Sequence, residues 1–270
     1  LEGCDTVVHL AGQTPGAGVA PERFDAVNDL GTARLAEQCA EVGVKTFVFA
    51  SSIFAVVDHV FDGVVDDKTA PRATTPYGRS KLAAESHVDA FAGEGRVGVS
   101  LRPPLVFGAR AKGNWHALQR LAASGLPLPF GLVRNRRSLI SVENLCNAFA
   151  RVVREPVQAG VFCVADADVV SLADMLRFLR AGMGLSPRLL PVPPVALEVG
   201  LGALGRTEMA QSLLGDLTVD ASRFREVYGW TPPVRTEDAV HASGRAFVAA
   251  EHGAGHQDPL RPEPDSARRD

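Results

Sequence analysis

Apolar residues in the first hundred positions gather into short runs that are separated by longer amphipathic stretches. Three runs, at residues 5–11, 46–50 and 97–101, are apolar on both faces, as strands buried inside a parallel sheet are. Between them, residues 21–42 repeat apolar side chains at a spacing near 3.6, and Pro76 opens a second helical stretch. This β-α-β-α-β alternation predicts an α/β fold built on a doubly wound parallel sheet.

Beyond Gly108 the pattern changes to shorter elements interrupted by prolines. Helices are predicted near residues 115–123 and 142–154, and strands near residues 138–140 and 161–164. Such a mixture of short elements, after a regular α/β half, is typical of a substrate lobe added to a nucleotide-binding core. The second half of the chain is therefore interpreted as contributing mainly to such a lobe.

These patterns divide the chain into three parts. A Rossmann-type core is predicted for residues 1–107, with about 136–170 returning to it. A smaller mixed substrate lobe is predicted for residues 108–135 and 171–250. Residues 251–270 lack a periodic apolar pattern, which predicts a disordered tail.

Composition narrows the class of protein further. Of the 270 residues 46% are hydrophobic and 22% are charged, as in ordinary globular proteins, and the net charge of −3 gives no reason to expect a nucleic-acid partner. No apolar stretch reaches the ~20 residues of a membrane helix and no signal peptide opens the chain, which predicts a cytoplasmic protein without a transmembrane segment. The four cysteines have no metal-ligand spacing and are expected to be buried free thiols, with no metal site. They are Cys4, Cys39, Cys146 and Cys163.

Candidate chemistry begins with Tyr77 and Lys81, which are four residues apart on one face of a predicted helix. The chain has two tyrosines and four lysines, so a Tyr-x-x-x-Lys pair arises by chance in only about 3% of such sequences. The alternative is a surface helix with a solvated lysine. A predicted strand that ends in Ser51 and Ser52 lies upstream, and this order favours a reactive group of Ser52, Tyr77 and Lys81.

With these residues in their order, the sequence resembles the extended short-chain dehydrogenase/reductase superfamily, in particular its NAD-dependent epimerase/dehydratase family and the UDP-sugar 4-epimerases within it. The resemblance covers roughly residues 5–248. Its matching segments are HLAG at 9–12, VNDLGT at 27–32, FVFASS at 47–52, YGRSK at 77–81, LRPPLVFG at 101–108, RSLISVENL at 137–145 and GWTPP at 229–233.

The resemblance implies roles for the reactive group. Tyr77 would exchange a proton with a sugar hydroxyl, and Ser52 would hydrogen-bond the same oxygen. Lys81 and an oxidised nicotinamide would lower the pKa of the phenol from about 10, and Lys81 would also hold the nicotinamide ribose. The cofactor implied is NAD, with NADP as the alternative. Its contacts would be Leu10, Ala11, Gly12, Asn28, Ser51, Tyr77, Lys81 and Pro103.

The two residues after Ser52 separate the reactions within the family. Dehydratases place an acid and a base there, whereas Ile53 and Phe54 cannot move protons. What remains is chemistry at one carbon, by a 4-epimerase of a UDP-hexose or UDP-N-acetylhexosamine in surface-polysaccharide synthesis, or by a 4-ketoreductase of a UDP-4-keto-6-deoxy-N-acetylhexosamine. A non-catalytic nucleotide-binding relative is a third reading, and the retention of Ser52, Tyr77 and Lys81 argues against it because the fold needs none of them.

The same resemblance implies that Asn114 and Arg137 bind the sugar nucleotide. An amide and a guanidinium suit a pyrophosphate, whereas the alternative for the arginines at 134, 136 and 137 is a solvated loop. A homodimer is also compatible with the resemblance. The sequence departs from the family at Leu105, Asn144 and Val57, which bears on the substrate more than on the fold.

The start of the chain departs further from the family pattern. Members begin with a strand, a glycine-rich G-x-x-G-x-x-G turn and a helix whose N-terminus holds the dinucleotide pyrophosphate. The chain begins at Leu1, and Gly12, Gly16 and Gly18 follow a later strand. We therefore expect a fragment that lacks roughly 70 upstream residues, about two βα units, and that binds NAD weakly by itself.

Overall fold

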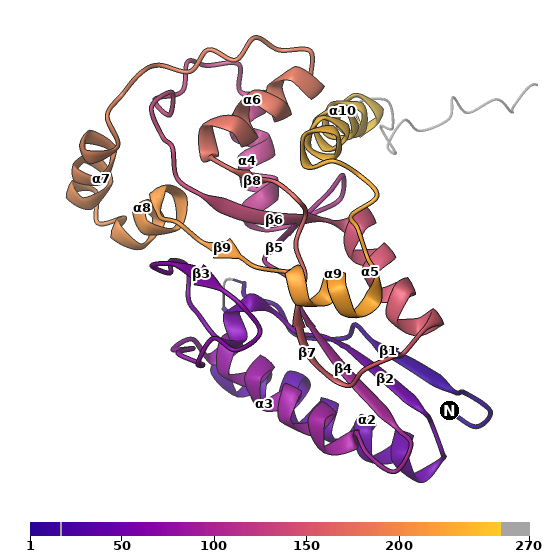
Figure 1. The fold of residues 1–270 in the computed structure, drawn as a ribbon. Coiled ribbons are helices and arrows are strands. Elements are labelled where there is room, and N and C mark those ends of the chain that lie inside the picture. The colour runs from indigo at the N-terminus through magenta and orange to yellow at the C-terminus, as the bar shows by residue number, and fades with distance from the viewer. Residues whose placement is uncertain (17, 255–270) are drawn as a thin grey trace, which may run out of the picture.

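A parallel sheet of four strands lies at the centre of the lower half of the molecule in the computed structural model, which describes residues 1–16 and 18–254 (Figure 1). Its strand order is β1-β2-β4-β7, and every neighbouring pair is parallel. The strands are β1 (Thr6–His9), β2 (Thr46–Ala50), β4 (Val97–Arg102) and β7 (Gly160–Cys163). The predicted strands and the predicted α/β class are confirmed.

Helices cover both faces of this sheet because successive side chains of a strand point to opposite sides. Phe47 and Phe49 of β2 pack against helices α2 (Leu30–Glu41) and α3 (Pro76–Phe91). Val48, between them, belongs to the core on the opposite face, which helices α5 (Val142–Arg154) and α9 (Ser222–Tyr228) complete. Figure 1 shows α2 and α3 below the sheet and α5 and α9 above it. Strands β2 and β4 are therefore buried on both sides, as their apolar sequences predict. Strand β1 lies at the edge of the sheet and Val8 is 38% exposed, so the prediction of burial on both faces is wrong for this strand.

The predicted helix over residues 21–42 is present but changes its geometry partway. It starts as α1 (Pro21–Phe24), widens into a π-helical turn over Asp25–Asp29, and continues as α2. Such single π turns often occur at functional sites. Here the widened turn carries the buried side chain of Asn28.

The upper half of the molecule is built around a second, three-stranded sheet. Helices α4 (Asn114–Ala123), α6 (Leu172–Gly182) and α10 (Thr236–Ala254) pack with it around buried residues such as Phe107, Trp115 and Leu176. The sheet order is β5 (Leu105–Phe107), β6 (Arg137–Ser141) and β8 (Val169–Val170). Helix α5 and β7 lie with the first sheet, whereas β6 belongs to this second one.

Smaller elements connect and extend the two halves. Strand β3 (Val64–Val65) pairs in parallel with β9 (Thr218–Val219). The helices α7 (Pro194–Ala203) and α8 (Thr207–Leu214) form the outer corner of the upper half (Figure 1). Within residues 1–16 and 18–254, no helix combines the length and apolarity that a bilayer crossing requires.

Two predictions about individual segments need correction. Helix α10 continues to Ala254, so residues 251–254 of the predicted tail are helical, and residues 255–270 lie outside the described part of the chain. All four cysteines are free thiols, and Cys39 and Cys163 are buried as predicted. Cys4 and Cys146 are exposed, so the prediction of burial is wrong for these two. Cys4 lies in a turn at the surface and Cys146 on the solvent-facing side of α5, so neither belongs to an apolar face that packs into the core.

Candidate active site

Ser52 and Tyr77 meet where strand β2 ends and helix α3 begins. After β2, Ser52 caps a short 3₁₀ turn over Ile53–Ala55, and its hydroxyl accepts a hydrogen bond from the Phe54 amide at 3.2 Å. A further hydrogen bond joins the side chains of Ser52 and Tyr77. Gly78 makes the approach of the two segments possible, because a β-carbon there would overlap the carbonyl oxygen of Phe54. The turn and the first turn of α3 are thus held in direct contact.

The pKa of the Tyr77 phenol is governed mainly by burial. Burial raises the pKa of Tyr77 above its ordinary value, and the hydrogen bond from Ser52 opposes that rise only in part. Lys81 directs its ammonium to the carbonyl oxygen of Ala50, at 2.8 Å, and lies 4.6 Å from the ring centroid of Phe49. The lowering expected from Lys81 together with an oxidised nicotinamide concerns the cofactor-bound protein and stays a prediction. In the chain by itself, desolvation raises the pKa of the phenol.

Lys81 itself is strongly affected by its surroundings. Its side chain is buried in the wall between α3 and β2. Burial lowers the pKa of Lys81 to about 8, and the nearby carboxylate of Glu85 acts in the opposite direction. Lys81 consequently changes its charge within the range in which enzymes work.

The predicted cofactor contacts lie at one edge of the first sheet, where the carboxyl ends of β1, β2 and β4 meet. Leu10, Ala11 and Gly12 follow β1 and are exposed there. A β-carbon at Gly12 would lie 3.3 Å from the ammonium nitrogen of Lys81 and 3.2 Å from Oδ1 of Asn28, so glycine keeps this edge open. Open α/β sheets bind dinucleotides at this edge.

Asn28 and Pro103 shape that edge through backbone contacts. The Asn28 side chain accepts a hydrogen bond from the Gln13 amide at 2.7 Å and donates to the Gln13 carbonyl and the Ser80 hydroxyl, each at 3.0 Å. The carbonyl of Pro103 accepts a hydrogen bond from the Ile53 amide at 2.9 Å. Both residues therefore hold neighbouring segments of the edge in place.

A buried group of Ser51, Glu85 and Arg102 lies behind the reactive residues. Arg102 donates two hydrogen bonds to the Glu85 carboxylate, at 2.8 and 2.6 Å, and the Ser51 hydroxyl donates a third at 2.5 Å. Neither Glu85 nor Arg102 is predicted from the sequence to have a role. One signal was present, because Glu85 continues the four-residue spacing of Tyr77 and Lys81 along the same helix face.

The predicted sugar-nucleotide residues lie in the upper half. Arg137, half-buried at the start of β6, donates hydrogen bonds to the carbonyl oxygens of His59 and Gly215, each at 3.1 Å. Burial lowers the pKa of Arg137, and Asp216 partly offsets this. Asn114 is exposed at the first turn of α4.

Aromatic contacts connect Arg137 with the reactive residues. The ring of Phe54 lies 6.4 Å from that of Tyr77 and 5.1 Å from that of His59, in edge-to-face arrangements. Since Arg137 binds the His59 carbonyl, this row leads from the phenol to the guanidinium. Ser52, Tyr77 and Arg137 are thus linked through Phe54 and His59. Among the described residues, no side-chain hydrogen bond or ring contact joins Asn114 to this row.

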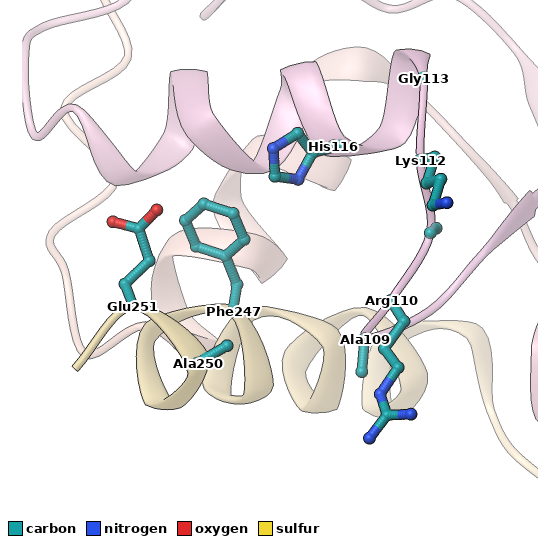
Figure 2. A pocket seen from close by; sticks show the side chains of 9 residues that line it. Ala109, Arg110, Lys112, Gly113, His116, Phe247, Ala250 and Glu251 are labelled. Carbon is teal, nitrogen blue, oxygen red and sulfur yellow. The ribbon is translucent and has the colours of Figure 1, made fainter. Parts of the chain in front are cut away.

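A pocket of about 420 Å³ opens beside α4 but contains none of these residues. It lies between the loop before α4 and the end of α10 (Figure 2). Its lining residues are Ala109, Arg110, Ala111, Lys112, Gly113, His116, Phe247, Ala250 and Glu251. This pocket is therefore separate from the reactive group.

The departures from the family pattern have structural explanations at two positions. Asn144 is fully buried, where its amide donates to Asp166 at 2.7 Å and to the Val234 carbonyl at 2.8 Å and accepts from the Val234 amide. Val57 is buried in the small core beside the 3₁₀ turn. Both residues are therefore buried in contacts within the chain, Asn144 through hydrogen bonds and Val57 through apolar packing.

Comparisons with known proteins agree with this arrangement. A family model described as "NAD dependent epimerase/dehydratase family" matches residues 1–165. UDP-glucose 4-epimerase from Vibrio cholerae is 35% identical over 230 residues, which cover 83% of this chain and 70% of the relative.

Solved structures share the fold. UDP-glucuronic acid 4-epimerase from Bacillus cereus in complex with NAD gives a TM-score of 0.71 at 19% identity, covering 91% of this chain and 74% of the other. RMD from Pseudomonas aeruginosa complexed with NADPH gives 0.70 at 22% identity, covering 91% and 82%. At these identities the likeness establishes the Rossmann-type fold, which the sequence predicts.

Proposed function

The chain belongs to the NAD-dependent epimerase/dehydratase family, and from that premise we propose that it is a UDP-sugar 4-epimerase. Its substrate would be a UDP-hexose or a UDP-N-acetylhexosamine, used in surface-polysaccharide synthesis. One observation carries the proposal: Ser52, Tyr77 and Lys81 gather at the cofactor edge of the sheet, while the positions after Ser52 hold Ile53 and Phe54.

Proton transfer at the sugar falls to Tyr77. Its phenol takes the proton of the C4 hydroxyl and later returns it, and the Ser52 hydroxyl holds the same oxygen in line. Burial disfavours the phenolate, so the positive charge of Lys81 is needed to offset that cost. Lys81 therefore has to be protonated for the reaction to run.

The residues at the sheet edge suit NAD. Gly12 leaves room where a side chain would meet Lys81 and Asn28, and Leu10 and Ala11 are exposed beside it. The bound cofactor supplies reversible oxidation of the sugar carbon. Lys81 would hold its ribose, and Ser51, Asn28 and Pro103 would shape the surface against its nicotinamide end.

Ile53 and Phe54 confine the reaction to one carbon. Loss of water needs a base beside the ketone and an acid for the departing hydroxyl, and neither side chain titrates. Ile53 is buried, and Phe54 presents its ring to Tyr77. The site can therefore epimerise or reduce a sugar, and it has no group in these positions for dehydration.

Recognition of the sugar nucleotide is assigned to Arg137 and Asn114. A guanidinium binds a pyrophosphate through charge-assisted hydrogen bonds. Arg137 lies at the end of the aromatic row that starts at Tyr77, which suits a ligand with its sugar at one end and its phosphates at the other.

Reduction of a 4-keto sugar is the second candidate function. The same three residues serve it, and RMD, complexed with NADPH, shares the fold. A 4-ketoreductase would consume NADPH with a UDP-4-keto-6-deoxy-N-acetylhexosamine and leave UDP-hexoses unchanged.

Product analysis with the full-length protein tests both candidates. UDP-glucose and UDP-N-acetylglucosamine are each incubated with NAD, and a UDP-4-keto-6-deoxy-N-acetylhexosamine is incubated with NADPH. The products are examined by mass spectrometry and proton NMR. Epimerisation leaves the mass unchanged and alters the C4 proton coupling, reduction adds two hydrogens, and dehydration removes water. A dehydrated product contradicts the interpretation of Ile53 and Phe54, and no conversion of any of these sugars contradicts the proposal as a whole.

A further inference from the structure

We propose that Glu85 is a positioning residue for the reaction, which holds Lys81 and Ser52 at the cofactor edge through its bonds to Ser51 and Arg102. The inference rests on the proposed function for the meaning of Lys81 and Ser52. Neither the buried carboxylate of Glu85 nor the buried guanidinium of Arg102 takes part in the proposed proton transfer or hydride transfer.

The bonds of Glu85 connect three elements of the fold. Glu85 lies on α3, Ser51 follows the end of β2, and Arg102 is the last residue of β4. One carboxylate oxygen accepts from Ser51 at 2.5 Å and from Nε of Arg102 at 2.8 Å, and the other accepts from Nη2 at 2.6 Å. A single carboxylate therefore fixes the helix that carries Tyr77 and Lys81 against the ends of two central strands.

Ser51 and Arg102 are each next in sequence to a residue that shapes the position of Ser52. Ser51 directly precedes Ser52, and its amide donates to the Leu101 carbonyl at 2.9 Å. Arg102 directly precedes Pro103, whose carbonyl accepts from the Ile53 amide. Displacing the Glu85 carboxylate would therefore move the backbone on both sides of Ser52.

Lys81 is linked to the same group. It lies one helical turn before Glu85, and its ammonium donates to the carbonyl of Ala50, the residue before Ser51. The charge of Glu85 favours the protonated form of Lys81 and so raises its pKa against the effect of burial. His9, at the end of β1, also faces this ammonium, and burial together with the charge of Lys81 lowers the pKa of His9. Glu85 thus acts on Lys81 both through the backbone and through its charge.

Stability alone is a weak explanation for this group. Glu85 and Arg102 are 4% and 5% exposed, and burying such a pair costs about as much as its attraction returns. Helix α3 already has an apolar anchor, since Ala84, Val88 and Phe91 pack against the sheet. What the ion pair adds is a defined position, which apolar packing by itself does not specify.

Glu85→Gln in the full-length protein tests the proposal, because it keeps the size of the side chain and removes its charge. We expect kcat to fall about 10- to 100-fold, as a small misplacement of reacting groups does, with the KM for the sugar nucleotide within about twofold. The alkaline limb of the kcat profile should move to lower pH, because Lys81 loses the carboxylate that keeps it charged.

A direct titration separates this inference from the proposed function. The chain has four lysines, so the Lys81 resonance can be followed by NMR of ¹³C,¹⁵N-lysine-labelled protein without any substrate. Its pKa should be lower in Glu85→Gln than in the parent. If the parent converts no UDP-sugar, the proposed function fails while this measurement still decides the role of Glu85.

Asp67→Asn is the matched control. Asp67 has a side chain that is 7% exposed and is paired with Arg223 at 3.1 Å, but it is bonded to the end of β7 and not to α3. It should lower the melting temperature and leave the Lys81 titration and the kcat profile unchanged. A Glu85→Gln variant with the same pattern, or with unchanged kcat, overturns the proposal.

Ser51→Ala covers the case in which Glu85→Gln does not fold. It removes one of the three bonds to Glu85 and leaves the ion pair with Arg102. We expect kcat to fall about 3- to 10-fold, since one charge-assisted hydrogen bond to the carboxylate is lost while the two bonds from Arg102 remain. A Ser51→Ala variant with parental kcat overturns the proposal.

Discussion

The reaction edge and the sugar-nucleotide end of the candidate site are built differently. At the reaction edge, Ser52, Lys81 and Glu85 are 7%, 5% and 4% exposed, and side-chain bonds tie α3 to β2 and β4. At the other end, Arg137 is half-buried and Asn114 is exposed. Chemistry is thus assigned to positions that several elements determine together, whereas recognition is assigned to the first residue of a strand and the first residue of a helix.

Helix α7, at the outer corner of the upper half, is exposed to solvent. None of its residues is buried in the described structure, and Val195 and Val199 are 68% and 67% exposed. Val48, in the centre of the lower sheet, is fully buried. Substitutions at the reaction edge should therefore change turnover, whereas substitutions in the upper half should change the affinity for the sugar nucleotide or have no effect.

Tyr77→Phe should have the largest effect, because it removes the group that exchanges the proton. We expect kcat in the full-length protein to fall by at least ~10² with cofactor binding retained, measured by steady-state kinetics and by titration with NAD. Tyr228→Phe is the matched control, since the hydroxyl of the second tyrosine bonds only the Gln158 carbonyl among the described residues. Turnover of Tyr77→Phe within a few-fold of the parent would contradict the assignment.

Arg137→Met should act on affinity. Charge-assisted hydrogen bonds are worth about 1.5–3 kcal/mol, so the KM for the sugar nucleotide should rise about 10- to 100-fold with kcat much less changed. Arg136→Met, at the exposed neighbouring position, serves as the control and should change KM by less than about twofold. A loss confined to kcat would place Arg137 at the reaction edge and remove the contrast.

The pH dependence of turnover should come from the reaction edge. Lys81 has a pKa of about 8, so its ammonium is present below that pH and is lost above it. We expect kcat to fall about tenfold for each pH unit above 8, while KM stays nearly constant because Arg137 keeps its charge there. A rate that continues to rise between pH 8 and 10 would show that Lys81 is not needed as a cation.

Val199→Ser should have the smallest effect. An exposed side chain on α7 contributes little to folding, so the free energy of unfolding in urea should change by less than about 0.5 kcal/mol. Val48→Ala removes two methyl groups from the sheet core and should cost about 2 kcal/mol. Equal losses for the two variants would mean that α7 is covered in solution.

Local patterns sufficed for the elements of the lower sheet. The strand over Thr46–Ala50 and the helix from Pro76 are where the apolar periodicity and the helix-opening proline place them. The same holds for the pair of Tyr77 and Lys81, whose spacing lies within one helix. Such features depend on a few neighbouring residues, which is why periodicity can locate them.

Features that join distant segments could not be derived in this way. The π turn that carries Asn28 interrupts a helix without changing its apolar period. The ion pair of Glu85 with Arg102 joins a helix to a strand, and the sequence of either segment alone does not predict it. The direction of the Tyr77 pKa depends on how deeply the phenol is buried, which spacing does not reveal.

The sequence by itself determined the α/β class, the order of the main elements and the identity of the Ser52, Tyr77 and Lys81 group, because these follow from short-range periodicity and residue chemistry. The tertiary structure alone decided how that group is supported and charged. Desolvation and contacts between α3, β2 and β4 set the pKa of Lys81 and fix Glu85 behind it. These energies depend on the environment that the folded chain creates, and they exist only once distant segments have packed together.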